Sequence, residues 1–341
     1  MNDWRIYRGV GEPHDGLRRL PPPPPWRDFA AAAAGPDAAT ADPTTARRLG
    51  FRRRLVENYA PRPAETDAVN AALYLRRPLL VTGNPGSGKS TLAYAVAHEL
   101  GLGRVLRWPI VSRTTLQDGL YRYDAIGRLQ DVQLERAQGQ SGDSVAAAAP
   151  SGIGSYIRLG PLGTALLPSE QPRMLLIDEL DKSDLDLPND LLNALEEGEF
   201  AIPELERIAD REPEVEVLTD DGRKVTVHGG RVACTAFPFI VLTSNGERDF
   251  PAPLLRRCVQ LELEPPGEEQ LTAMVEAHLG GESITESRDL IDRFLDREPG
   301  EIIAADQLLN ALFLTQHAPH AERLTRERIA DLLLQPLDRS R

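Results

Sequence analysis

The segment from Gly83 to Ser90, GNPGSGKS, constrains the fold of this chain more than any other part of it. It fits the pattern G-x-x-x-x-G-K-[ST] and lies between an apolar run, 78–82, and a helical pattern, 92–100. Glycines in such a loop turn backbone N–H groups inward around phosphates, the lysine reaches the β- and γ-phosphates, and the last hydroxyl ligates Mg²⁺. The sequence therefore predicts a strand, a phosphate-binding loop and a helix. The residues predicted to bind nucleotide are Gly83, Asn84, Pro85, Gly86, Ser87, Gly88, Lys89, Ser90 and Thr91, with Ser90 also a metal ligand.

A second motif follows the apolar run 174–177, where the carboxylates Asp178 and Glu179 are adjacent. At the end of a strand, one carboxylate can hold Mg²⁺ through its water shell, and its neighbour can act as general base on an attacking water. Acidic pairs are also common where helices begin, so this pair gains its meaning from the phosphate-binding loop upstream. We predict that Asp178 is a metal ligand and Glu179 a catalytic base.

Two further polar groups follow the apolar run 239–243. Asn245 offers an amide that can orient water near a γ-phosphate, although Ser-Asn-Gly is also ordinary turn chemistry. Arg256 and Arg257 end the segment PAPLLRRC, where an exposed guanidinium pair either reaches a phosphate on a neighbouring subunit or is a plain surface pair. The candidate catalytic residues are therefore Glu179, Asn245, Arg257 and Arg256.

Composition and periodicity divide the chain into three parts. Residues 1–45 form a Pro- and Ala-rich extension, largely irregular, whose aromatic residues indicate docking on the body or on a partner. Residues 46–264 carry the motifs and predict an α/β nucleotide-binding domain, with a parallel sheet covered by helices on both faces. Residues 265–341 show only helical patterns and predict a separate α-helical domain.

Further elements are predicted from local patterns. A fourth apolar strand is expected at 105–110, and an Asp-Gly turn between 215–218 and 224–228 predicts a hairpin. Residues 139–155, rich in Gly, Ser and Ala, predict a mobile loop. The remaining helical patterns are 46–59, 66–75 with Val69, Ala72 and Leu73 on one side, and, in the C-terminal part, 268–279, 285–295, 305–316 and 322–334.

Charge and composition limit the partners and the compartment. The 341 residues carry a net charge of −13, and residues 178–216 contain fifteen Asp and Glu against three basic residues. This stretch repels a phosphate backbone, which argues against nucleic acid as a partner, or it is simply a solvated face. No apolar run approaches the roughly 18 residues of a membrane span, so we expect a cytoplasmic protein without membrane contacts. Cys234 and Cys258 are expected to be buried reduced thiols.

Together the motifs resemble those of the AAA+ ATPases, and within them the MoxR-type branch, over roughly residues 64–335. GNPGSGKST resembles the family's Walker A motif, LLIDEL its Walker B motif, LTSN its sensor 1 strand and PAPLLRRC its arginine-finger segment. The run LLNALEEGEFAIPEL resembles the branch's helix after Walker B, which leads into a hairpin before sensor 1. Walker A is shared by all P-loop proteins, so the order of the four motifs with the hairpin narrows the family.

The resemblance implies an α/β fold with a P-loop AAA+ core, a parallel sheet, a β-hairpin insertion before sensor 1 and a C-terminal α-helical lid domain. It implies ATP and Mg²⁺ as cofactors, Asn245 as sensor 1, and Arg257, ahead of Arg256, as the arginine finger. Where the family commonly has a sensor 2 arginine, the chain reads Ile303-Ala304-Ala305-Asp306. That role is therefore absent or falls to Arg288, Arg293 or Arg297.

The 89 residues from Lys89 to Asp178 exceed the spacing usual in the family, and we assign the excess to residues 114–167. In a ring this insertion would lie near the pore or its rim, where Tyr121 and Tyr123 could grip a polypeptide. Packing of these tyrosines on the sheet is the alternative.

Three functions compete. The first is an ATP-driven, chaperone-like motor: a homo-oligomeric ring, expected to be a hexamer, that remodels or matures a partner protein. MoxR-type ATPases are often encoded beside proteins with von Willebrand factor A domains, so the resemblance implies such a partner. The second is a nucleic-acid motor, favoured by the Arg-rich segment 47–54 and opposed by the acidic segment 178–216. The third is a nucleotide switch, for example in a bacterial conflict system, or a small-molecule kinase, although the chain lacks the N-K-x-D element of GTPases.

Overall fold

The computed structural model describes residues 4–29, 59, 61–139, 152–279, 288–295, 305–317, 328 and 332–334. All of the predicted helix at 46–59 except Tyr59, and most of the predicted loop at 139–155 and of the predicted helix at 322–334, lie outside these residues. Among the described helices, none is both long enough and apolar enough to cross a membrane.

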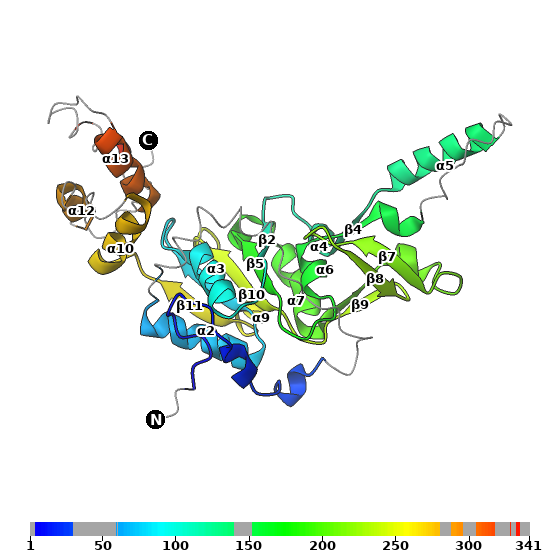
Figure 1. The fold of residues 1–341 in the computed structure, drawn as a ribbon, viewed down its shortest axis with the longest axis horizontal. Coiled ribbons are helices and arrows are strands. Elements are labelled where there is room, and N and C mark those ends of the chain that lie inside the picture. The colour runs from blue at the N-terminus through cyan, green and yellow to red at the C-terminus, as the bar shows by residue number, and fades with distance from the viewer. Residues whose placement is uncertain are drawn as a thin grey trace.

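A five-stranded parallel sheet forms the centre of the body (Figure 1). Its strands are β1 (Leu79–Gly83), β2 (Leu106–Pro109), β5 (Met174–Asp178), β10 (Phe239–Ser244) and β11 (Val259–Leu263), in the order β11-β1-β10-β5-β2. The structure confirms the four strands predicted from apolar runs. Parallel strands that are covered on both faces have continuous apolar sequences, which is why these runs predicted them. β11 was not predicted, because Gln260 and Glu262 are exposed at the edge of the sheet and interrupt its apolar pattern.

Helices cover both faces of this sheet, as predicted. One face carries α2 (Pro63–Leu75) and α3 (Lys89–Glu99), and the other carries α6 (Pro161–Ala165) and α7 (Leu187–Glu197). Alternate strand residues serve the two faces: Val81 and Leu176 pack with the first pair of helices, and Leu80 and Ile177 with the second. α2 begins before the predicted position because Pro63 occupies its first turn, where a missing N–H costs nothing. Its predicted apolar side, Val69, Ala72 and Leu73, is buried.

A second sheet of six strands lies beside the first (Figure 1). It consists of β3 (Tyr121–Tyr123), β4 (Ile157–Leu159), β7 (Glu214–Leu218), β8 (Lys224–His228), β9 (Arg231–Ala233) and β6 (Glu199–Ala201), in that order. β7 and β8 pair antiparallel from Glu214 opposite His228 to Leu218 opposite Lys224, which confirms the predicted hairpin. Gly222 supplies the left-handed turn residue, with φ of +85°.

The insertion 114–167 is part of this second sheet. It forms α4 (Leu116–Leu120), β3, α5 (Ala125–Gly139), the 3₁₀ turn η3 (Ile153–Tyr156), β4 and α6, and β4 pairs in parallel with β7. Tyr121 is buried, and its hydroxyl donates a 2.9 Å hydrogen bond to Glu204 of α8 (Pro203–Glu206). Tyr121 is therefore a packing residue and is not available to grip a polypeptide. Tyr123 is half-buried and accepts a hydrogen bond from Arg128.

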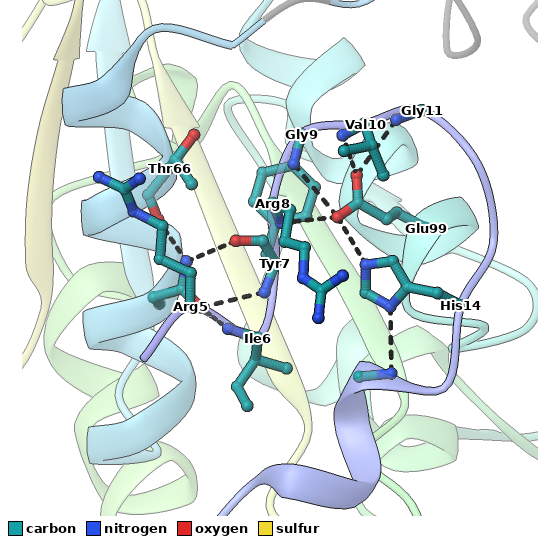
Figure 2. Close-up of polar contacts among 12 residues, drawn as sticks. Arg5, Ile6, Tyr7, Arg8, Gly9, Val10, Gly11, His14, Thr66 and Glu99 are labelled. Carbon is teal, nitrogen blue, oxygen red and sulfur yellow. Dashed lines mark hydrogen bonds and ion pairs between the residues drawn. The ribbon is translucent and has the colours of Figure 1, made fainter. Parts of the chain in front are cut away.

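Residues 4–29, which we call the N-terminal strap, cross the body and include the 3₁₀ turns η1 (Gly16–Arg19) and η2 (Pro25–Arg27). Ile6 and Tyr7 are buried in the core with α2 and α3. The Asn70 side chain on α2 accepts hydrogen bonds from the backbone N–H groups of both and donates to the carbonyl of Tyr7 (Figure 2). Apart from its 3₁₀ turns the strap is irregular, and Ile6 and Tyr7 dock it on the body.

The carboxylate of Glu99, at the end of α3, holds the next part of the strap (Figure 2). It is 1% exposed and accepts hydrogen bonds from the backbone N–H groups of the four residues from Arg8 to Gly11 and from the ring of His14. Gly9 and Gly11 have φ of +72° and +74°, which curves this backbone around the carboxylate. The strap is thereby fixed to the helix that begins at the phosphate-binding loop.

Three helices follow β11: α10 (Glu268–Leu279), α12 (Arg288–Leu295) and α13 (Ala305–His317). They share a hydrophobic cluster of their own, which includes Leu271, Ile291, Phe294 and Leu312. The short α9 (Ala252–Leu255) precedes β11.

Candidate functional site

The loop between β1 and α3 has the conformation that phosphate binding requires. Gly86 and Gly88 have φ of +77° and +92°, and α3 begins directly after Gly88, three residues earlier than predicted. A Cβ atom on Gly83 would lie 2.4 Å from the carbonyl oxygen of Leu263, so only glycine fits where β1 meets β11. The loop therefore ends in the N-terminus of a helix of eleven residues, where unpaired N–H groups and the helix dipole favour an anion.

Lys89 is 8% exposed and turned back over the loop. Its Nζ donates hydrogen bonds to the carbonyls of Gly83, at 2.7 Å, and Asn84, at 2.9 Å. Burial lowers the pKa of Lys89, and the negative charges of Asp181, Asp178 and Glu179 oppose that effect. The ammonium of the loop's lysine is thus held against the loop backbone by two of its carbonyls.

Asp178, at the end of β5, brings the phosphate loop and three strands together. Its Oδ1 accepts hydrogen bonds of 2.8 Å from the hydroxyls of Ser90 and Thr243, and its Oδ2 accepts 2.9 and 2.6 Å bonds from Nε and a terminal nitrogen of Arg107. Burial would raise the pKa of this carboxyl, but the hydrogen bonds from Ser90, Arg107 and Thr243 outweigh burial and lower it. Asp178 is therefore held ionised against Ser90, which brings the two predicted metal ligands side by side.

Ser90 and Asp178 fit Mg²⁺ by their chemistry. They offer a hydroxyl and a carboxylate 2.8 Å apart, and Mg²⁺ in phosphate-transfer sites binds one or two such oxygens besides the phosphates and water. Within the described part of the chain, no group of three or more His, Cys, Asp or Glu is placed to hold a metal by itself. The site thus suits a metal that arrives with a nucleotide.

Glu179 has an unusual backbone conformation, with φ of +62° and ψ of +51°. Non-glycine residues seldom adopt this left-handed region, and such strain concentrates at functional sites. Its N–H donates a 2.9 Å hydrogen bond to the hydroxyl of Thr243, which fixes the turn. The half-exposed carboxylate pairs with Lys182 at 2.8 Å. Glu179 therefore projects beyond Asp178 toward solvent.

Asn245 follows β10, the strand between β1 and β5, so it lies at the same edge of the sheet as the phosphate loop and Asp178. Its backbone N–H donates a 2.8 Å hydrogen bond to Asp181, in the 3₁₀ turn η4 (Leu180–Lys182). The structure thus gathers the loop, Asp178, Glu179 and Asn245 at the carboxyl ends of the parallel strands, which we call the carboxyl edge of the sheet.

Arg256 and Arg257 lie at the opposite, amino ends of the parallel strands, which we call the amino edge of the sheet. They precede β11, which runs parallel to β1 in register, whereas the phosphate loop follows the carboxyl end of β1. Five strand residues separate the two edges, about 16 Å at 3.3 Å per residue. Arg256 is exposed, and Arg257 forms an ion pair with Glu196 at the end of α7. Neither is directed to the phosphate loop of its own subunit.

Of the arginines considered for a sensor 2 role, only Arg288 has a side chain that the structure describes. Arg288 pairs with Glu268 and Asp292 among the C-terminal helices. The side chain of Arg293 and all of Arg297 lie outside the part of the chain that the structure describes.

Four contributors were missed by the sequence analysis: Arg107, Thr243, Asp181 and Lys182. Thr243 stands within the LTSN segment, and Asp181 and Lys182 directly follow LLIDEL, so their position was a usable signal. Arg107 had none, because it is an exposed residue in the alternating segment Leu106–Pro109 and reaches Asp178 only through strand pairing.

A comparison with protein families gives one match: residues 78–258 match the AAA domains of the dynein-related subfamily. The matched region starts immediately before β1, ends immediately before β11 and covers more than half of the chain. It includes the phosphate loop, Asp178, the hairpin and Asn245. No curated protein matches the chain.

Proposed function

The chain belongs to the AAA domains of the dynein-related subfamily, and from this premise we propose that it is an ATPase with its site at the carboxyl edge of the central sheet. The observation that carries the proposal is the convergence on Asp178, where the Ser90 hydroxyl of the phosphate loop bonds to a buried carboxylate. This is the arrangement that phosphoryl transfer needs, because such catalysis is mostly positioning and charge stabilisation.

Each residue of the site has a role that its position supports. The loop backbone and Lys89 bind the phosphates, and Ser90 and Asp178 hold Mg²⁺, whose chemistry is to offset negative charge on the phosphates. Glu179 is the general base, because its carboxylate projects from the end of β5 toward solvent beside Asp178. Asn245 orients water from the neighbouring strand β10.

Replacement of Glu179 by glutamine tests this assignment. We expect Glu179→Gln to bind ATP with near-normal affinity and to hydrolyse it about 10²-fold or more slowly, because the amide cannot accept a proton. Glu197→Gln, on the exposed end of α7, is the matched control and should leave turnover unchanged. Retained hydrolysis in Glu179→Gln would move the base to another residue.

We further propose a homo-oligomeric ring, expected to be a hexamer, in which Arg257 acts on the ATP of the neighbouring subunit. The support is geometric: Arg257 lies at the edge of the sheet opposite its own phosphate loop, so it can reach a phosphate only in another copy. Within one subunit, the positive charge of Arg257 is paired with the carboxylate of Glu196.

For the cellular task we propose a MoxR-type, chaperone-like motor that remodels a partner protein, for which a von Willebrand factor A domain protein is the expected class. The β7–β8 hairpin placed before β10 supports the branch. Stimulation of the ATPase by a purified protein of this class would support it, and stimulation by DNA with a steep salt dependence would favour the nucleic-acid motor instead. The acidic residues of 178–216 argue against DNA, since exposed carboxylates such as Asp184, Asp186 and Asp190 repel phosphates.

A further inference from the structure

Asp181 is a buried carboxylate at the phosphate site for which the family's motifs gave no role. It stands in η4, three residues after Asp178, and is 3% exposed. Its Oδ2 accepts hydrogen bonds from the backbone N–H groups of Asn245, at 2.8 Å, and Glu247, at 3.2 Å. Its Oδ1 is buried and has no hydrogen-bond partner among the described residues. Burial of a carboxylate with one unpaired oxygen costs folding free energy. Asp181 is therefore a candidate for a functional role.

Both hydrogen bonds of Asp181 come from the loop that carries Asn245, while its charge also acts on Lys89. Arg248 of the same loop donates a 2.7 Å hydrogen bond to the carbonyl of Ser183, so the loop is docked both on η4 and on the residue that follows it. Upstream, Thr243 bonds both to the Asp178 carboxylate and to the Glu179 N–H. The chain is therefore held at two points here: at Thr243, two residues before Asn245, and at the N–H of Asn245 itself, which is bonded to Asp181.

Backbone hydrogen bonds to a charged acceptor are stronger and more directional than bonds between neutral groups. A loop that leaves a sheet has no backbone hydrogen bonds to a neighbouring strand that would define its path. The hydrogen bonds from the N–H groups of Asn245 and Glu247 to Asp181 therefore fix the position of the Asn245 backbone. Because η4 also contains Lys182, the partner of Glu179, one short turn fixes both groups relative to Asp178.

We propose that Asp181 is a positioning residue for hydrolysis: it fixes the backbone of Asn245 against the turn that carries Glu179, and acts through Asn245 rather than on the nucleotide. This rests on the proposed ATPase function and adds to it a residue outside the phosphate-binding set.

The test compares Asp181→Ala, Asp181→Asn, Asn245→Ala and the double variant Asp181→Ala/Asn245→Ala in the full-length protein. Asp181→Ala removes both backbone bonds, and a misplaced catalytic group costs up to about 10²-fold in turnover. We expect kcat to fall by about that factor, with the Kd of ATP within about 3-fold of the original, because no residue of the phosphate loop is changed and Asp178 and Glu179 still act on Lys89. Asp181→Asn keeps an oxygen acceptor and should restore most of kcat. If Asp181→Ala does not fold, as judged by its thermal transition, Asp181→Ser replaces it.

The double variant is decisive. If Asp181 acts through Asn245, the two substitutions are not additive, and the double variant should be no slower than Asn245→Ala alone. Additive losses, an equal loss in Asp181→Asn, or a large loss of ATP affinity in either Asp181 variant would overturn the proposal. Normal turnover in Asn245→Ala with slow turnover in Asp181→Ala would instead refute the role of Asn245 and, with it, this inference. Normal turnover in Asp181→Ala would refute the inference alone.

Discussion

At the scale of single residues, the site is organised by charge. Two carboxylates, Asp178 and Asp181, are buried within one short stretch, and each is compensated by donors from other elements. Arg107 and Lys182 supply the nearby cations for Asp178 and Glu179. Such desolvated charges hold fixed positions, because any displacement leaves one of them unpaired.

Removal of the Lys89 ammonium should abolish high-affinity nucleotide binding. Lys89→Ala deletes the only cationic side chain in the phosphate loop, and charge-assisted bonds to phosphate are among the strongest in proteins. Titration with a fluorescent ATP analogue should show at least about a 10²-fold weaker Kd, equivalent to about 3 kcal/mol. Lys224→Ala, on the exposed hairpin, is the control. Unchanged affinity of Lys89→Ala would contradict the assignment of the loop.

The ion pair between Arg107 and Asp178 should make stability depend on pH. Because the pKa of Asp178 is lowered in the folded protein, the pair stabilises the fold above the unfolded-state pKa and loses its effect as the pH falls below about 4. Arg107 is half-exposed, so Arg107→Ala should cost only about 1 kcal/mol at pH 7. Urea unfolding at several pH values should show this difference shrinking toward acid. The exposed Arg113→Ala is the matched control, and a difference that does not change with pH would contradict the ion pair.

At the scale of elements, the N-terminal strap connects parts of the body that are distant in sequence. Besides the contacts with Asn70 and Glu99, the buried Arg27 donates to the carbonyl of Arg76 after α2 and to that of Leu195 in α7. A cation at the carboxyl ends of two helices is favourable. The strap thus joins the phosphate-loop helix to the helix that carries the partner of Arg257.

Truncation of Glu99 should destabilise the protein. Glu99→Ala leaves the N–H groups from Arg8 to Gly11 without an acceptor and should cost about 2–4 kcal/mol, and Glu99→Gln, which keeps one oxygen, should cost less. Thermal unfolding and limited proteolysis of the strap measure the effect, with the exposed Glu170→Ala as control.

Deletion of residues 1–29 should lower soluble yield, because Ile6 and Tyr7 complete the core. A deletion variant with full stability would show that the strap only docks partners.

At the scale of the whole molecule, the two ends of the parallel sheet have different tasks. The carboxyl edge carries the phosphate loop and the acidic residues, and the amino edge carries Arg257. In the ring that we propose, the amino edge of one copy would lie against the carboxyl edge of the next, a head-to-tail contact of the kind that forms a ring when its rotation closes.

Mixing of two inactive variants tests this arrangement. Arg257→Ala should bind ATP normally and lose about 10³-fold in hydrolysis, as arginine fingers do, while Glu179→Gln lacks the base. Mixed assemblies contain interfaces with Arg257 from one variant and Glu179 from the other, so activity should partly return. The exposed Arg256→Ala gives the matched comparison for the choice of finger. Without recovery after verified subunit exchange, the shared site would be excluded.

The sequence by itself determined those features that neighbouring residues encode. The strand, loop and helix around Lys89, the apolar strands, the hairpin turn and the acidic pair after β5 all follow from local periodicity, glycine conformation and turn chemistry. The edge strand β11 was missed because its alternating pattern is short and polar on one side.

Only the tertiary structure decided which distant residues meet. Arg107 and Thr243 reach Asp178 across 71 and 65 residues of sequence, because β2 and β10 flank β5, and no local pattern encodes that order of strands. The same holds for the strap, whose N–H groups find Glu99 about 90 residues away. Contacts of this kind depend on how the helices and strands pack against one another, and that packing is the sum of many weak burial terms spread over the whole chain.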